Sequence, residues 1–174
     1  NEDGRMYFEV TADGTPLRMR RYLFSECFAA IAMSEYSIAS GKQEYAEKAL
    51  EVFHTIQHYA NTPGLLEPKY LPAMKCQGHS LTMILINTAS RLREAIDAPE
   101  LTKQIDLSLE KLEKYFVHPE YKAILETVGL NGELIDTLNG RVINPGHCIE
   151  TSWFILEEAR LSLIHISEPT RRYA

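Results

Sequence analysis

Two residues in the C-terminal part of the sequence are of a kind, and at a spacing, that suits proton transfer. His147 is followed three residues later by Glu150, just after Pro145 and Gly146 and at the start of a helix predicted over 149–160. Residues three apart share a helical face, and a carboxylate there can orient an imidazole and stabilise its charged form. Such a pair suits general acid–base chemistry. The alternative is an ordinary helix start, in which the histidine faces solvent and the glutamate favours the positive end of the helix dipole.

Helices and short strands must position such a pair. Apolar residues recur at helical spacing in four earlier segments, at 20–40, 43–60, 80–95 and 99–116. The third of these is apolar almost all round at its start, which predicts burial on several sides. Two β-hairpins are also expected, one with strands at 6–10 and 15–17 and one with strands at 124–128 and 134–136.

The more buried of the predicted helices begin at intervals of roughly 55–70 residues, which indicates a weak internal repeat. If buried and exposed helices alternate, the buried ones run parallel and their first turns meet at one end of a ring. Polar residues at these turns, Glu26, His79, His147 and Glu150, would then line one mouth of a cavity. For His79, simple packing at the helix start is an equally good interpretation.

Composition and charge limit the class of protein. The 174 residues are 45% hydrophobic, enough for one domain with a core. The formal net charge is −6 and there is no block of Lys and Arg, which argues against nucleic-acid and anionic-membrane partners. No apolar run approaches the ~20 residues that span a bilayer. The three cysteines, Cys27, Cys76 and Cys148, have no zinc spacing and fit a reducing compartment, so we expect a cytoplasmic protein.

One histidine pair has a spacing that occurs in metal sites. His54 and His58 stand four residues apart in the second predicted helix, but they share their face with Glu47 and Glu51, opposite the apolar stripe. This pattern is typical of a solvated outer face. We therefore predict no metal site.

Three motifs follow one another along the chain. They are RYLFSECFAA at 21–30, GHSLTMIL at 78–85 and LNGRVINPGHCIETSWF at 138–154. In this order they resemble the N-acylglucosamine 2-epimerase family, over residues 4–160. Phe24 departs from the pattern, because many members have Tyr there, and no hydroxyl role is expected at this position.

The resemblance implies an all-α fold, a partial (α/α)6 toroid of helical hairpins with short β-hairpins in the connections. Members are more than twice this length and have a second essential histidine further downstream, so residues 1–160 would be a fragment of one barrel domain. The segment 161–174 resembles translated sequencing-adapter sequence; we expect a non-native tail and give His165 no role. The isolated fragment is expected to be inactive and to aggregate, with apolar side chains such as Leu81, Ile84 and Phe154 partly in water.

The resemblance also implies a reaction. A sugar 2-epimerase would interconvert N-acylglucosamine and N-acylmannosamine by removing and returning the proton at C2. His147 would be one base and Glu150 its orienting group, while Glu26, His79 and Trp153 would bind the sugar. Trp153 would form a stacking wall, unless it belongs to the core.

Several alternatives stay open from the sequence. Cellobiose 2-epimerases and aldose–ketose isomerases share this fold and the Gly-His-x-Ile-Glu motif. A noncatalytic helical-repeat module that binds a protein partner is the rival from another class. Under the epimerase interpretation the partner is a small neutral sugar and no cofactor is required. A nucleotide effector, known for some members, and a homodimer of the complete protein follow from the family alone.

Overall fold

The computed structural model describes residues 2–71 and 73–162, and α-helices dominate this part of the chain. The mostly helical fold class is therefore confirmed. Residues 163–174, which include most of the predicted tail and His165, lie outside the described residues. None of the described helices is long and apolar enough to cross a membrane. The five α-helices are α1 (Phe24–Ser40), α2 (Gln43–Asn61), α3 (Ser80–Ala95), α4 (Pro99–Tyr115) and α5 (Pro145–Ser162).

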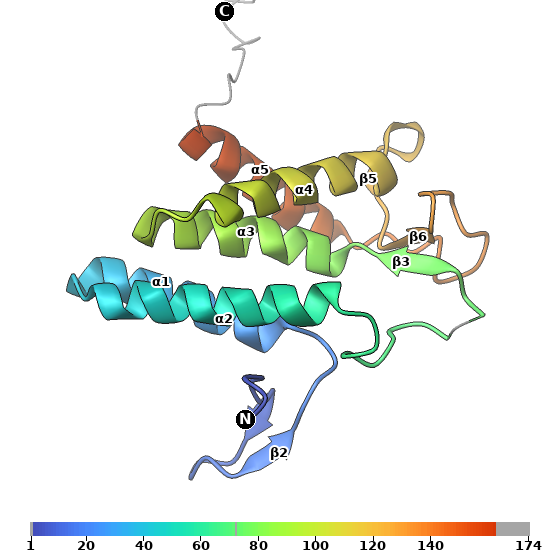
Figure 1. The fold of residues 1–174 in the computed structure, drawn as a ribbon. Helices are drawn as coiled ribbons and strands as arrows, with labels where there is room; N and C mark the ends of the chain where they lie inside the picture. The colour runs from blue at the N-terminus through green and yellow to red at the C-terminus, as the bar shows by residue number, and fades with distance from the viewer. Residues whose placement is uncertain (1, 72, 163–174) are drawn as a thin grey trace, which may run out of the picture.

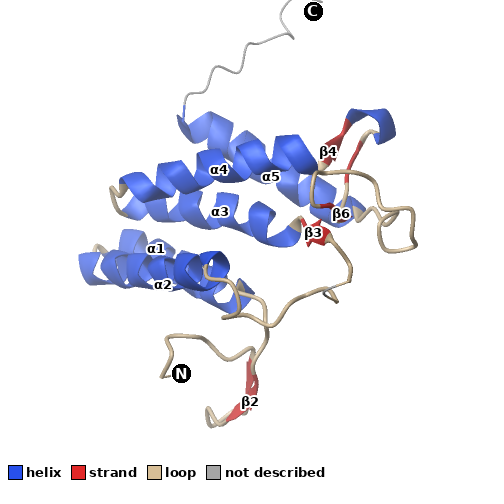
Figure 2. Cartoon of the chain, turned by 45° about the vertical axis from the view of Figure 1, so that its right-hand side comes forward, coloured by secondary structure: helices blue, strands red, loops and turns tan. Residues whose placement is uncertain are grey.

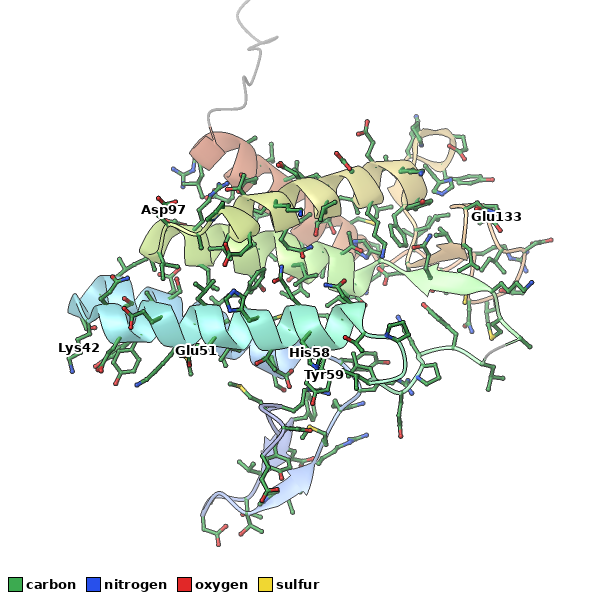
Figure 3. The ribbon with its side chains drawn as sticks, viewed as in Figure 1. Lys42, Glu51, His58, Tyr59, Asp97 and Glu133 are labelled. Carbon is green, nitrogen blue, oxygen red and sulfur yellow. The ribbon has the colours of Figure 1, made fainter. Side chains whose placement is uncertain are left out.

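The helices form two antiparallel hairpins followed by a single helix. α1 pairs with α2, α3 pairs with α4, and α3 also packs against α1 and α5. Figure 1 shows α1, α3 and α5 running in one direction and α2 and α4 in the opposite one, which confirms the predicted alternation. The tight turns at Lys42 and Asp97 lie at one end of the helices, and Glu133 lies in the loops at the other end (Figure 3). The first turns of α3 and α5 face these loops.

Local chemistry explains where the helices stop and start. Gly41 ends α1 in the left-handed conformation, with φ of 69°, and its N–H donates to the Ser37 carbonyl. α5 begins at Pro145, four residues earlier than predicted. Proline is favoured in a first turn because its missing N–H has no partner there anyway. Asn144 caps this end, since its side-chain oxygen accepts from the His147 N–H at 3.3 Å.

Two apolar clusters make up the core, and α3 contributes to both. One lies between α1, α2, α3 and α4 around Phe53 and Ile84. The other joins α3 and α4 to α5 through Phe116 and Phe154. Ile84 and Phe154 are thus buried, so the expectation that they lie partly in water is wrong. The exposed apolar side chains of α5 are instead Ile149, Trp153 and Leu156.

A polar contact also fixes α5 against α3. The Glu158 carboxylate is 2% exposed. It accepts hydrogen bonds from Ser90 at 2.9 Å and from the Arg93 guanidinium at 2.7 and 2.8 Å. A buried carboxylate is stable only with such partners. The register of α5 along α3, and with it the position of its first turn, is therefore specified.

Of the two β-hairpins predicted from the sequence, one is present in the structure. The expected N-terminal hairpin is present as β1 (Glu9–Val10) and β2 (Pro16–Arg18). The second expected hairpin is wrong, because 134–136 is not a strand. β6 (Thr127–Gly129) pairs instead with β3 (Cys76–Gly78), and β5 (Ala123–Ile124) pairs with β4 (Val117–His118), next to a 3-10 turn at Pro119–Tyr121.

A tight turn accounts for the different pairing. The Gly129 N–H donates to the Glu133 carbonyl at 2.8 Å, and the Glu133 carboxylate accepts from the Asn131 N–H. The chain therefore reverses within a few residues and leaves the strand direction. The backbone edge of β6 therefore pairs with β3, the strand that comes directly before α3. Figure 2 shows β3, β4 and β6 together at one end of the helices.

Candidate active site

The β3–β6 pair brings Glu126 to the start of α3. Gly78 lies opposite Thr127 in the antiparallel register. One residue beyond each of them, the His79 N–H donates to the Glu126 carbonyl at 3.1 Å. His79 caps α3 and Glu126 ends the link between β5 and β6. Backbone pairing thus joins two polar residues that are far apart in the sequence.

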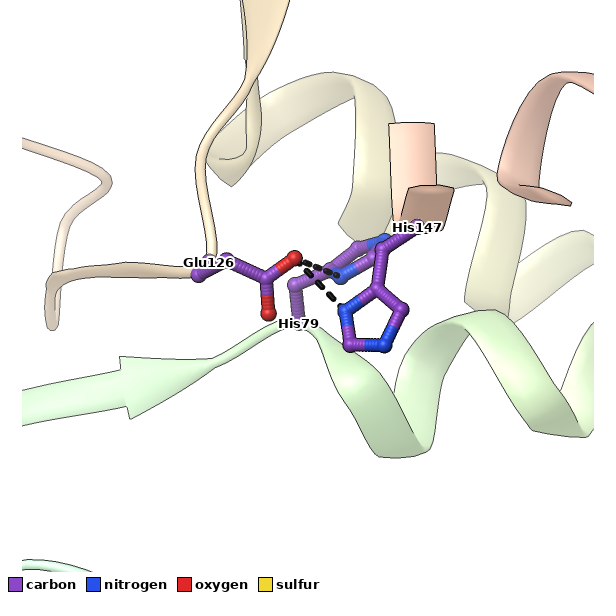
Figure 4. Close-up of side chains that lie close together, drawn as sticks. All are labelled: His79, Glu126 and His147. Carbon is purple, nitrogen blue, oxygen red and sulfur yellow. Dashed lines mark hydrogen bonds and ion pairs between the residues drawn. The ribbon is translucent and has the colours of Figure 1, made fainter. Parts of the chain in front are cut away.

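The first turn of α5 adds a histidine to this pair. The His147 Nδ1 atom lies 2.8 Å from Oε1 of Glu126 (Figure 4). The adjacent Cys148 thiol donates to the Ile124 carbonyl at 3.4 Å, which holds the helix start against β5. The His147 side chain is 37% exposed and that of Glu126 is 16% exposed. The carboxylate is thus largely covered, while one edge of the imidazole reaches solvent.

His79 is the buried member of the cluster. Its side chain is 1% exposed, and its ring packs edge-on against Phe116 with centroids 5.8 Å apart. Burial lowers the pKa of His79 to about 4, because the cation loses its hydration; the nearby Glu126 carboxylate opposes this shift only in part. His79 is therefore neutral at neutral pH.

The hydrogen bonds of Thr151 fix the tautomer of His79. The Thr151 hydroxyl donates its only hydrogen to the His147 carbonyl at 2.7 Å. Its oxygen also lies 2.9 Å from His79 Nε2, so this nitrogen must be the donor. The neutral ring then carries its lone pair on Nδ1. That atom is buried without a hydrogen-bond partner in the described structure and lies 3.8 Å from Glu126 Oε1.

The geometry at His147 is that of an oriented general base. Glu126 accepts the hydrogen bond at Nδ1, which places the proton of the neutral ring there and leaves the lone pair on Nε2. A carboxylate in this position also stabilises the imidazolium that forms when Nε2 takes up a proton. The arrangement can therefore move a proton to and from a ligand at the exposed edge of His147.

The carboxylate that contacts His147 is Glu126, which the sequence analysis missed. Among the described contacts, Glu150 makes no ion pair or hydrogen bond with His147, although it is only one turn further along α5. Helical spacing favours Glu150 but cannot reveal a partner from a separate segment. The only signal for Glu126 was its place within the strand predicted at 124–128.

The Glu26 side chain is fully buried. Its Oε1 atom accepts from the Arg5 guanidinium at 2.6 Å and from the Met6 N–H at 2.9 Å. Arg5 also donates to the carbonyls of Arg20 and Tyr22. This network ties the N-terminal segment to α1. The sequence analysis predicted a sugar contact by Glu26. Such a contact would require the buried ion pair between Glu26 and Arg5 to open.

Trp153 is 52% exposed on α5, with its ring centroid 5.2 Å from that of the buried Phe154. It is therefore not part of the buried core, and its stacking role stays a prediction. A cavity of about 210 Å³ lies at the first turns of α1 and α3. Its walls are charged, aromatic and aliphatic, and they include Arg21, Tyr22, Leu66, Lys69, Tyr70 and Leu81.

One group of side chains in the described part of the chain has the composition of a metal site. The ligand atoms of His79, Glu126 and His147 lie within 4.8 Å of one another. The His54–His58 pair is not such a group. His54 is exposed and bonds to Glu100 on α4 at 3.1 Å, and His58 lies on the surface of α2 (Figure 3).

Comparison with known proteins shows the family of the chain. The sequence pattern of the N-acylglucosamine 2-epimerase (GlcNAc 2-epimerase) family matches residues 1–169. The chain is 32% identical over 153 residues to N-acylglucosamine 2-epimerase of Homo sapiens, which covers 86% of this chain and 36% of the human protein. It is 30% identical over 158 residues to the Mus musculus protein of the same name, with 87% and 37% covered. The chain thus spans little more than a third of the length of these relatives. It belongs to the N-acylglucosamine 2-epimerase family.

Proposed function

We propose that the protein takes part in the epimerisation of an N-acylated amino sugar at C2, interconverting N-acylglucosamine and N-acylmannosamine. One observation carries this proposal, the contact of 2.8 Å between His147 Nδ1 and Glu126 in a member of this family. An imidazole that is oriented by a carboxylate and open to solvent on its other edge is suited to abstract a proton. A helical-repeat module that only binds a protein partner would have no need for this arrangement.

The reaction requires an open sugar ring, in which the carbonyl at C1 makes the C2–H bond acidic. Nε2 of His147 takes the C2 proton and leaves an enolate, whose negative charge lies on the C1 oxygen. Return of a proton to the opposite face inverts the centre, so a second base must face the first. The chain spans 36% of the human relative, and we assign the opposing base to the remainder of a complete protein. The imidazole itself accepts the proton, so we propose that this step needs no cofactor.

We further propose that the described helices belong to an (α/α)6 toroid. α1, α3 and α5 would be inner helices, and α2 and α4 outer ones. The packing of α3 against both α1 and α5 supports this assignment, as does the hairpin pairing of α1 with α2 and of α3 with α4. In such a ring the first turns of the inner helices surround one mouth. His79 and His147 stand at two of these turns.

A cavity at the first turns of α1 and α3 supports a sugar as the substrate class. Its walls combine polar, aromatic and aliphatic side chains, which suit a neutral sugar with hydroxyl groups and an apolar face, although His147 and Glu126 do not line it. We propose that Trp153 stacks on the sugar ring. Cellobiose epimerisation and aldose–ketose isomerisation use the same proton abstraction, so the His147–Glu126 pair by itself does not select among these substrates.

Exchange of the C2 proton with solvent tests the proposal. In D2O, a complete protein with this chain should incorporate deuterium at C2 of N-acetylmannosamine. His147→Gln should lower the rate by roughly 10²–10⁴-fold, the usual contribution of a general base. His54→Gln is the matched control, because His54 also bonds to a glutamate, and it should leave the rate unchanged. Exchange at the wild-type rate in His147→Gln would rule out His147 as the base.

A further inference from the structure

Three arginines without carboxylate partners stand where β2 leads into α1 (Figure 1). Arg18 ends β2, and Arg20 and Arg21 follow it before α1 begins. None of the three makes an ion pair within 4.0 Å with a described residue. Each of the other described arginines has such a pair: Arg5 with Glu26, Arg91 with Glu94, Arg93 with Glu158, Arg141 with Asp136 and Arg160 with Glu157. The chain has a formal net charge of −6, so a shortage of carboxylates does not explain this difference.

The three arginine side chains line one cavity. Its volume is about 320 Å³, and the other residues in its wall are Met19, Tyr22 and Glu67. Glu67 is the only carboxylate among these wall residues, and it is exposed and makes no ion pair with the arginines. Three guanidinium groups against one carboxylate leave the cavity with an excess of positive charge.

Aromatic rings hold two of the guanidinium groups. The group of Arg20 lies over the Phe8 ring, 4.5 Å from its centroid, and that of Arg21 lies over the Tyr22 ring at 5.1 Å. A guanidinium that lies over a ring keeps the N–H groups of its edge for hydrogen bonds to a ligand. The Arg20 Nε–H is buried and has no hydrogen-bond partner among the described residues. A buried donor without an acceptor costs free energy, and a bound anion would supply the acceptor.

Tyr22 shows the effect of these charges. Arg21 donates to its hydroxyl oxygen at 3.1 Å. The pKa of Tyr22 is lowered, first by this hydrogen bond and then by the charges of Arg21, Lys69 and Arg20, which favour the phenolate. Arg21, Tyr22 and Glu67 line both this cavity and the cavity at the first turns of α1 and α3. The positive potential therefore acts on a wall that the two cavities share.

We propose that Arg18, Arg20 and Arg21 form a binding site for a phosphate group. The planar fork of an arginine matches two phosphate oxygens and can form two parallel hydrogen bonds with them. The cavity is at the lower end of the range of about 300–1,000 Å³ that is usual for small-molecule sites, which suits a group of this size. Because of the shared wall, a phosphate here is either free or attached to a sugar in the neighbouring cavity.

Isothermal titration calorimetry of a complete protein with this chain, at constant ionic strength and without sugar, tests the site. Inorganic phosphate should bind at one per chain. Arg18→Gln and Arg20→Gln should each weaken this binding roughly 10–100-fold, the usual contribution of a charge-assisted hydrogen bond. Arg20→Lys keeps the charge but loses the fork, so it should weaken binding less than Arg20→Gln does.

Two control variants should bind phosphate like the wild type. Arg141→Gln removes an exposed arginine that pairs with Asp136, outside the cluster. His147→Gln removes the proposed base, so unchanged binding in this variant keeps the test independent of the epimerase reaction. Variants are compared after their thermal melts have been shown to match that of the wild type. If Arg20→Gln fails this condition, Arg18→Gln decides, because the Arg18 side chain is exposed.

A second titration, with N-acetylglucosamine 6-phosphate, identifies the source of the phosphate group. Tighter binding than that of inorganic phosphate, lost in Arg21→Gln, would show a phosphorylated sugar that spans both cavities. Equal binding of the two probes would show a site for free phosphate. The proposal is overturned if neither probe binds, if Arg18→Gln and Arg20→Gln bind like the wild type, or if Arg141→Gln weakens binding as much as they do.

Discussion

His147 Nδ1 and Glu126 Oε1 lie 2.8 Å apart, and they join the first turn of α5 to the segment that precedes β6. The imidazole reaches solvent while the carboxylate is mostly covered. The base and its orienting group are therefore held by different elements. A change in either element would alter the position or the tautomer of the base.

Substituting the orienting carboxylate should reduce C2-proton exchange strongly. In Glu126→Gln the amide can donate to His147 Nδ1, which moves the ring proton to Nε2 and removes the lone pair that abstracts the substrate proton. We expect a loss of roughly 10²-fold or more in the deuterium-incorporation rate. Glu150→Gln makes the same substitution at the glutamate that lies one turn after His147 on α5, and we expect a smaller loss of the exchange rate. A larger effect of Glu150→Gln would return the orienting role to Glu150.

Folding stability should fall as the pH is lowered from 6.5 to about 4. Burial lowers the pKa of His79 from 6.5 to about 4, so in this range the unfolded chain binds a proton that the folded chain excludes. The contribution of His79 is complete above pH 6.5 and is lost towards pH 4, with a total on the order of 3 kcal/mol. Urea unfolding at several pH values measures it. His79→Gln should have a flatter pH dependence, and identical curves would contradict the assignment.

The buried ion pair near the N-terminus should matter far more for stability than an exposed one. Arg5→Gln leaves the fully buried Glu26 carboxylate without its guanidinium partner, and we expect a loss of about 3–5 kcal/mol. Arg141→Gln removes an exposed pair with Asp136 and should cost about 0–1 kcal/mol. Chemical denaturation of both variants gives the comparison. Equal losses would show that the Arg5 network is not coupled to the fold of α1.

Replacing two neighbouring aromatic residues on α5 by alanine should have different effects on the free energy of unfolding. Phe154 is 4% exposed in the core between α3, α4 and α5, so Phe154→Ala should cost about 3–5 kcal/mol in unfolding free energy. Trp153→Ala should change stability little, because the indole is half exposed. If Trp153 stacks on the sugar, its loss should instead raise KM in the epimerase assay. An unchanged KM would exclude the stacking role.

Local pattern was sufficient for most of the helical fold. The apolar spacing placed α2, α3 and α4 within a residue of their observed ends, because each helix has its own apolar stripe and its own stop signal. The alternation of buried and exposed helices also gave their directions correctly. Short connections at 41–42 and 96–98 make α1 and α2, and α3 and α4, antiparallel, whereas the long connections at 62–79 and 116–144 do not by themselves fix a direction. His147 stood out because Asn144, Pro145 and Gly146 mark a helix start in the sequence itself.

The partners of the site residues were decided by tertiary structure alone. Glu126 lies close to His79 and His147 because β6 pairs with β3 and not with the segment 134–136. Strand pairing between distant segments leaves no local pattern in the sequence. The burial of Glu26 could not be predicted from local pattern either, because its partner Arg5 comes from a separate segment. The sequence by itself therefore determined the helices and pointed to His147 as a base, whereas packing between distant segments determined which carboxylate meets His147 and which polar side chains are shielded from solvent.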